Sequence, residues 1–227
     1  MLFRSVNGKA RLAIILDDWG ASAALLDDVI ALGRPVTLSI LPRLPNSAKI
    51  AHAAAKNRLG VMLHMPMESQ NPAASKESEV ITVSMPDARI RRYLETALAS
   101  IPGVRGVNNH QGSAATSNER VMRAVLSYLK ERNLFFVDSY VIATSKGPFV
   151  AREVGIPFAK RDVFIDNDAH VEPIKEQLRK AIQKALRNNT AIAIGHDKRP
   201  TLEAIRQMIP EIEKAGVRLV LVEELVA

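Results

Sequence analysis

Short apolar runs rich in β-branched residues recur along this chain, and they alternate with segments whose apolar residues lie three and four positions apart. The runs that we expect to form strands are 12–16, 36–41, 61–65, 104–108, 134–138, 162–166, 191–195 and 217–222. The helix-period segments are 21–32, 46–58, 87–99, 118–132, 173–187 and 202–215. This spacing suits βαβ units and predicts a parallel sheet covered by helices.

The number of repeats favours closure of the sheet into a (β/α) barrel of seven to eight parallel strands. Nothing resembling a linker divides the chain, so we expect a single domain spanning residues 1–227. Two segments, 69–84 and 140–155, interrupt the rhythm and are expected to be long loops. Loops of that length in a compact domain are usually functional or mobile.

Composition narrows the class of protein. Hydrophobic residues make up 47% of the 227 residues, but the longest apolar runs are too short to cross a bilayer. The N-terminus lacks the pattern of a signal peptide, so we expect none in this sequence. The absence of cysteine excludes a disulfide framework, a thiolate metal site and a cysteine nucleophile. The net charge of +7 is scattered and aromatics are only 4%, so we expect no nucleic-acid partner.

Acids and histidines in apolar surroundings fall at the predicted strand ends: Asp17, Asp18, His64, Glu68, His110, Asp138, Asp166 and His196. The carboxyl ends of parallel strands converge on one face, where active sites are found. Each residue alone could be an ordinary cap or a satisfied core group, but together they favour a site. The other two histidines, His52 and His170, are expected at the surface.

Imidazoles and carboxylates without thiolates suit a divalent ion, most simply Zn²⁺, with Mn, Co, Fe or Ni as alternatives. Three protein ligands and one open position would describe a catalytic site, in which the ion acidifies water and polarises a carbonyl. A nearby carboxylate could then act as general base and a further histidine as general acid.

Six blocks in order resemble the signatures of the divergent polysaccharide deacetylases, a distant branch of the NodB-like chitin and peptidoglycan deacetylases. They are IILDDWG (14–20), LHMPME (63–68), GVNNHQGS (106–113), FVDS (136–139), DVFIDN (162–167) and IAIGH (192–196). The resemblance implies a distorted (β/α) barrel and a metal-dependent hydrolase that acts on C–N or ester bonds of acetylated carbohydrate. It also implies the bacterial cell envelope or periplasm. The sequence leaves the oligomeric state open.

The resemblance implies residue roles as well. Asp17 matches the catalytic base, Asp18 a metal ligand, His64 the first metal-binding histidine and His196 the general acid. The second histidine of the better-known branch is replaced by Glu68, so we predict that His110 completes a metal set of Asp18, His64 and His110.

Supporting or substrate-binding roles are predicted for Glu68, Asn109, Asp138, Asp166 and Trp19. Asp138 is the preferred partner for fixing a histidine tautomer, Asp166 a weaker candidate, and Glu68 as a ligand the lesser option. Tyr140 and Phe149 would either stack on a sugar or pack the long loop. Because the ligand pattern departs from that branch, two alternatives stay open: an inactive carbohydrate-binding or regulatory protein of the cell envelope, and a hydrolase with another substrate.

Overall fold

The computed structural model describes residues 10–71 and 79–226, so residues 72–78 of the predicted loop 69–84 lie outside the described residues. The strands are β1 (Ala10–Trp19), β2 (Thr37–Ile40), β3 (Gly60–Met67), β4 (Gly106–Gln111), β5 (Phe135–Asp138), β6 (Phe158–Lys160), β7 (Val163–Phe164), β8 (Thr190–His196) and β9 (Val217–Val220). The helices are α1 (Leu26–Ile30), α2 (Ser47–Lys56), α3 (Asp87–Ala99), α4 (Glu119–Glu131), α5 (Gly147–Val154), α6 (Val171–Asn188) and α7 (Arg199–Lys214), with a short 3₁₀ turn η2 at Val222–Glu224.

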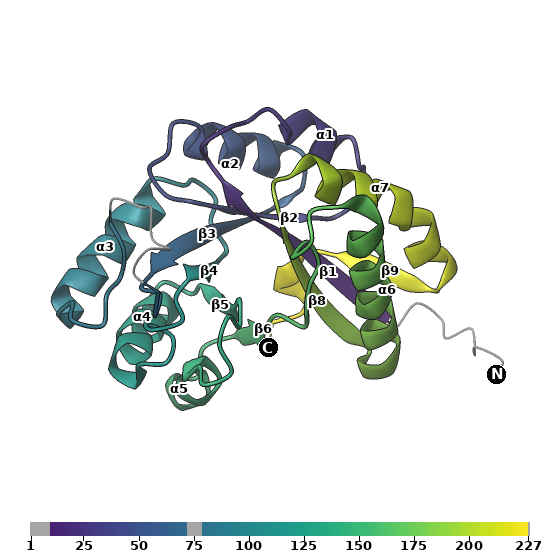
Figure 1. Cartoon of the computed structure of the whole chain (residues 1–227). Coiled ribbons are helices and arrows are strands. Elements are labelled where there is room, and N and C mark those ends of the chain that lie inside the picture. Colours follow the sequence, from purple (N-terminus) through teal and green to yellow (C-terminus); the bar gives the residue numbers. More distant parts are fainter. Residues whose placement is uncertain (1–9, 72–78, 227) are drawn as a thin grey trace.

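The strands form one parallel sheet in the order β6-β5-β4-β3-β2-β1-β8-β7, with helices on its outer side (Figure 1). β9 pairs with the first half of β1, at Ala10–Ala13, while β2 pairs with its second half. The strands β6 and β7 stand at opposite ends of this order, although only two residues separate them in sequence. The sheet therefore curls into a distorted barrel that the chain crosses, without strand pairing, between β6 and β7.

The predicted barrel is thus confirmed, with three local corrections. Each of the eight predicted runs overlaps a strand, but no run was predicted at β6. The predicted loop 140–155 contains helix α5, whose Pro148 lies in the first turn and whose Gly155 ends it at φ 70°. Proline in the first turn and glycine directly after the last are typical helix boundaries, so this segment is a helix rather than a structureless loop. The helix expected at 21–32 covers only Leu26–Ile30.

The core has two parts. The larger lies between the sheet and the helices, and the smaller fills the barrel with Ala13, Ile15, Met62, Phe135, Val137, Ile192, Ile194, Val220 and Val222. Alternation along β1 places Leu12, Ile14 and Leu16 in the outer part and Ala13 and Ile15 in the inner one, as a pleated strand requires. No helix within the described ranges is long and apolar enough to cross a membrane.

Close packing inside the barrel leads to a stability prediction at Gly106, the first residue of β4. A Cβ there would lie 2.1 Å from Cε2 of Phe135, its register partner on β5. We expect Gly106→Ala to lower the free energy of unfolding by about 1–3 kcal/mol, because the ring must leave its place in a filled interior. Urea unfolding measures this change.

The control is the double variant Gly106→Ala/Phe135→Leu, in which the smaller side chain makes room for the methyl group. We expect its unfolding free energy to exceed the value for additive single substitutions, since neighbouring sites couple. Additive effects would contradict the proposed clash.

Candidate active site

The site forms where the inward-facing rows of three strands turn from apolar to polar. Ala13 and Ile15 of β1 are followed two residues later by Asp17, and Met62 of β3 is followed by His64. In β8 the inward row Ile192–Ile194 ends in the same way at His196. Because strand side chains repeat every two residues, these polar groups cap the apolar barrel interior at the carboxyl ends of the strands.

Asp18 reaches the same site through a break in the strand. Successive strand residues face opposite sides, so Asp17 and Asp18 could not share one face of a regular β1. The β1–β2 register shifts between Leu16 and Trp19, and Asp18 has a left-handed φ of 70°. This irregularity turns its carboxylate toward the histidines. Aspartate tolerates that backbone conformation better than most side chains.

Asp18, His64 and His110 bring one ligand atom each to a common point. Asp18 Oδ1 lies 3.0 Å from His110 Nδ1 and 3.2 Å from His64 Nε2, and the two nitrogens are 3.1 Å apart. Asp18 Oδ1 is buried, yet no hydrogen bond of normal geometry reaches it from the described residues. A buried oxygen beside two imidazole nitrogens fits the donor set of Zn²⁺ or another first-row ion.

Charge within this cluster shifts its titration. Burial opposes ionisation of Asp18, but the two neighbouring imidazoles outweigh it and hold the pKa of that carboxyl well below its usual range. Burial would lower the pKa of His64, but Asp17 and Asp18 overcome this and raise the pKa of His64 to about 9. The two carboxylates therefore favour positive charge at this point even though His64 is buried.

Asp17 lies deeper than Asp18. Its side chain is only 5% exposed, against 34% for that of Asp18, and its Oδ2 is 3.7 Å from His64 Nε2. Burial raises the pKa of Asp17, while His64 and a 2.9 Å hydrogen bond from Asn108 Nδ2 oppose that rise. A carboxylate with a raised pKa beside a cation site is suited to accept a proton.

His196 is held by Asp166. His196 Nδ1 and backbone N–H lie 2.8 Å from Asp166 Oδ1 and Oδ2, and Thr201 donates to Oδ2 at 2.7 Å. The other ring nitrogen, Nε2, is 3.8 Å from Asp18 Oδ2. Burial would lower the pKa of His196, but the hydrogen bond and charge of Asp166 outweigh it and raise that pKa. His196 is therefore oriented with Nε2 toward the cluster.

This pairing predicts that Asp166→Asn lowers the pKa of His196, because the carboxylate that favours the imidazolium is removed while burial remains. An NMR titration of the metal-free protein measures it. Asp162→Asn is the matched control, since Asp162 accepts a hydrogen bond from the same strand, at Ile192 N, and does not contact His196. An unchanged His196 pKa in Asp166→Asn would remove Asp166 from this role.

The prediction that Asp138 fixes a histidine tautomer is wrong. Its Oδ1 accepts from Tyr140 N at 2.7 Å and its Oδ2 from Ser145 Oγ at 2.6 Å, so the carboxylate holds the following loop. The contact with a histidine is made by Asp166, which the sequence had ranked lower. Asp138 ends β5 and Asp166 lies two residues beyond β7, and the sequence alone does not reveal which of the two acids faces His196.

Three further supporting residues are placed differently from the prediction. Glu68 is bonded to Val83 N and stands apart from the cluster of Asp18, His64 and His110. Asn109 bonds the backbone of Gln111 and Ser139 and so ties β4 to the end of β5. Trp19 is 0% exposed and part of the outer core, so it presents no ring to a substrate.

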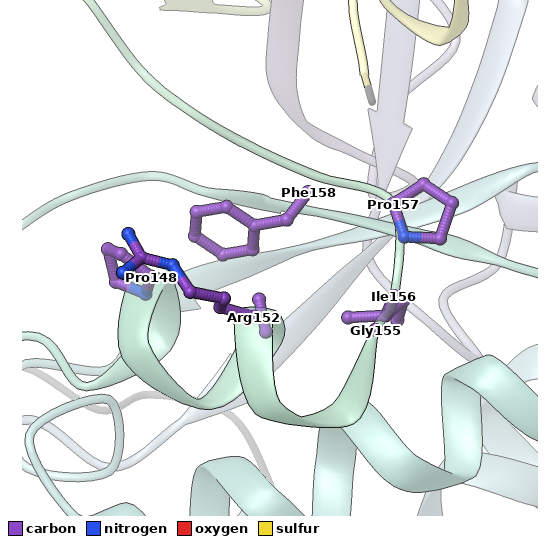
Figure 2. A pocket seen from close by; sticks show the side chains of 7 residues that line it. Pro148, Arg152, Gly155, Ile156, Pro157 and Phe158 are labelled. Carbon is purple, nitrogen blue, oxygen red and sulfur yellow. The ribbon is translucent and has the colours of Figure 1, made fainter.

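The remaining predictions concern the surface. His52 is exposed on α2, and His170 is exposed and paired with Asp168, as expected. Phe149 is 52% exposed, and Lys160 Nζ lies 4.4 Å from the ring centroid of Tyr140. A hollow of about 410 Å³ lies between α5 and β6 and includes Pro148, Arg152 and Phe158 (Figure 2). None of its lining residues belongs to the polar cluster.

Sequence reasoning missed three residues near the site. Asn108 contacts both His64 and Asp17, and its position two residues before His110 on one strand could have revealed it. Asp197 directly follows His196; burial and the nearby charge of Asp18 raise the pKa of Asp197 to about 7. Arg161 binds the carbonyls of Ser139 and Tyr140 at the crossing from β6 to β7, and no sequence signal marks it.

Comparison with known proteins places the chain in a family. The family model for divergent polysaccharide deacetylases matches residues 14–226. The uncharacterized Escherichia coli K12 protein YibQ is 32% identical over 88% of this chain, and a Haemophilus influenzae protein is 29% identical over 92%. The chain spans 62% of the length of the first relative and 76% of the second.

Solved structures share the fold. An uncharacterized Agrobacterium tumefaciens protein superposes with a TM-score of 0.90 at 23% identity, over 96% of this chain and 89% of that one. A CE4 family pseudoenzyme from Bacillus anthracis gives 0.62 at 13% identity, over 97% and 66%. A family 4 carbohydrate esterase from Streptomyces lividans in complex with acetate gives 0.57 at 14% identity, over 94% and 93%. With its family motifs matched along almost its whole length, this chain belongs to the divergent polysaccharide deacetylases.

Proposed function

We propose that this protein is a metal-dependent hydrolase that removes acetyl groups from a polysaccharide or cell-wall sugar. The observation that carries the proposal is the convergence of Asp18 Oδ1, His64 Nε2 and His110 Nδ1 within 3.0–3.2 Å of one another. Asp17 and His196 lie beside this convergence. Membership of the deacetylase family and the fold shared with a carbohydrate esterase support the same activity.

The exposure of the side chains indicates which side of the site is open to solvent. His64 and Asp17 are 3% and 5% exposed, whereas His110, His196 and Asp18 are 15%, 20% and 34% exposed. A substrate therefore approaches from the side of Asp18, His110 and His196. Asp17 would meet it from below, at the floor of the site.

Asp18, His64 and His110 would hold the divalent ion, with Zn²⁺ as the first candidate. Bound there, the ion would lower the pKa of a coordinated water and polarise the acetyl carbonyl. Asp17 is placed to take the proton of the attacking water. His196 is placed to give a proton to the leaving amine or alkoxide, and Asp166 keeps His196 Nε2 directed into the site.

The direct test is acetate release from acetylated chitin oligomers, acetylated xylan and peptidoglycan fragments, with the metal-free protein compared with the protein loaded with Zn²⁺ or Co²⁺. We expect acetate from at least one substrate only when metal is present, and none from His110→Ala. The alternative is a non-catalytic carbohydrate-binding protein, and the fold shared with a pseudoenzyme is the observation behind it. Sugar binding by calorimetry without acetate from any metal-loaded sample would favour this alternative and overturn the hydrolase.

A further inference from the structure

The buried side-chain amide of Asn108 contacts both His64, a predicted metal ligand, and Asp17, the predicted base. Asn108 lies on β4, directly beside His64 of β3 in the strand register, and it is 0% exposed. Its side-chain oxygen is 2.8 Å from His64 Nδ1 and accepts from Ser39 Oγ at 2.5 Å. Its side-chain nitrogen donates to Asp17 Oδ1 at 2.9 Å and to Ser139 Oγ at 3.3 Å. All four hydrogen-bonding positions of the amide are therefore in use.

The carboxylate fixes which way this amide faces. An ionised Asp17 only accepts hydrogen bonds, so the group 2.9 Å from its Oδ1 must be the NH₂ of Asn108. Ser139 agrees, because its own hydroxyl donates to Asn109 O at 2.8 Å and can accept from Asn108. A flipped amide would place its oxygen against the carboxylate oxygen. The amide oxygen is thereby left facing His64.

The amide oxygen in turn determines which ring nitrogen of His64 carries the proton. Since that oxygen cannot donate, His64 Nδ1 must carry a proton and donate to it. When His64 is neutral, its lone pair is then on Nε2, the atom 3.2 Å from Asp18 Oδ1 and 3.1 Å from His110 Nδ1. The other tautomer would point an N–H at the place where the ligand atoms converge.

We propose that Asn108 is a positioning residue that acts on both halves of the site, presenting the Nε2 lone pair of His64 to a metal ion and holding Asp17 ready as base. The second action rests on the proposed hydrolase function, whereas the first concerns metal binding alone. Groups that orient a ligand histidine in this way commonly change metal affinity about 10–100-fold when they are removed.

Asn108→Leu tests the proposal, with two readouts that need no substrate. The first is the Nδ1–H resonance of His64 in ¹H–¹⁵N spectra of the metal-free and Zn²⁺-loaded protein. We expect a downfield, slowly exchanging signal in the parent and its loss in the variant. The second is Zn²⁺ affinity, measured by competition with a chelating dye, which we expect to fall about 10–100-fold.

Two further variants separate positioning from simple structural support. Asn108→Asp keeps an oxygen acceptor for His64, and its new carboxyl group is expected to share one proton with the nearby Asp17 carboxyl. The variant should therefore retain the resonance and the Zn²⁺ affinity, while Asp17 is no longer free to act as base. Asn109→Ala alters the adjacent residue, which is 1% exposed and bonds backbone groups. We expect that variant to lower thermal stability and to leave the His64 resonance in place.

An Nδ1–H signal that persists in Asn108→Leu, together with Zn²⁺ affinity within twofold of the parent, would overturn the proposal. Should Asn108→Leu not fold, loss of the signal in Asn108→Asp would overturn it equally, because the acceptor is still present there. These outcomes are distinct from failure of the hydrolase function. A protein that releases no acetate can still show the hydrogen bond and its effect on Zn²⁺ binding.

Discussion

Protein purified without chelator or a metal-affinity tag is expected to contain near-stoichiometric divalent metal, and His64→Ala or His110→Ala is expected to abolish it. Each substitution removes one of three ligand atoms that lie 3.0–3.2 Å apart. Because even the groups around a site change affinity about 10–100-fold, we expect loss of a ligand to cost at least about 100-fold. Elemental analysis and Zn²⁺ titration measure the effect.

The chain supplies its own controls for this experiment. His52 and His170 are exposed and do not belong to the cluster of Asp18, His64 and His110, so His52→Ala and His170→Ala should retain the metal. Glu68→Gln should retain it too, since the Glu68 carboxylate bonds Val83 N rather than joining the cluster. A parent that takes up neither Zn²⁺, Co²⁺ nor Mn²⁺ would refute the metal site, and loss of metal in Glu68→Gln would return Glu68 to the ligand set.

Asp17→Asn is expected to lower the rate of acetate release by about 10²–10⁴, the usual contribution of a general base, while metal content stays unchanged. The introduced amide oxygen can still accept the hydrogen bond of Asn108, so the site should keep its shape. Asp168→Asn, which alters an exposed carboxylate paired with His170, is the control. Full activity in Asp17→Asn would exclude Asp17 as the base.

Asp17→Asn is not expected to destabilise the protein, although it should lower the rate of acetate release. The folded-state pKa of Asp17 is raised by burial, so its ionised form is disfavoured in the folded protein and its contribution to stability falls as the pH rises through that pKa. At neutral pH, Asp17→Asn should therefore keep or raise the melting temperature of the metal-free protein. A lower melting temperature would mean that the carboxylate stabilises the fold.

The strand-end acids and histidines were visible in the sequence because the barrel follows simple periodicities. Alternation along β1 and β8 carries an apolar inward row directly into Asp17 and His196, and these two residues are register partners. The local pattern therefore fixed both the strands and the face on which these side chains lie. Helix α5 escaped prediction because its proline and glycine are equally typical of a turn.

The sequence by itself determined the repeating strand–helix units, the barrel, the family motifs and the gathering of polar groups at one end of the strands. All of these depend on local periodicity and on the rule that parallel strands end together. Only the tertiary structure decided that Asp18 turns inward at a break in β1, that Asp166 rather than Asp138 holds His196, and that Asn108 joins His64 to Asp17. Each of these depends on side chains from different strands that meet across the barrel. The strand register and the backbone irregularities that bring them together cannot be recognised from the order of residues along a single strand.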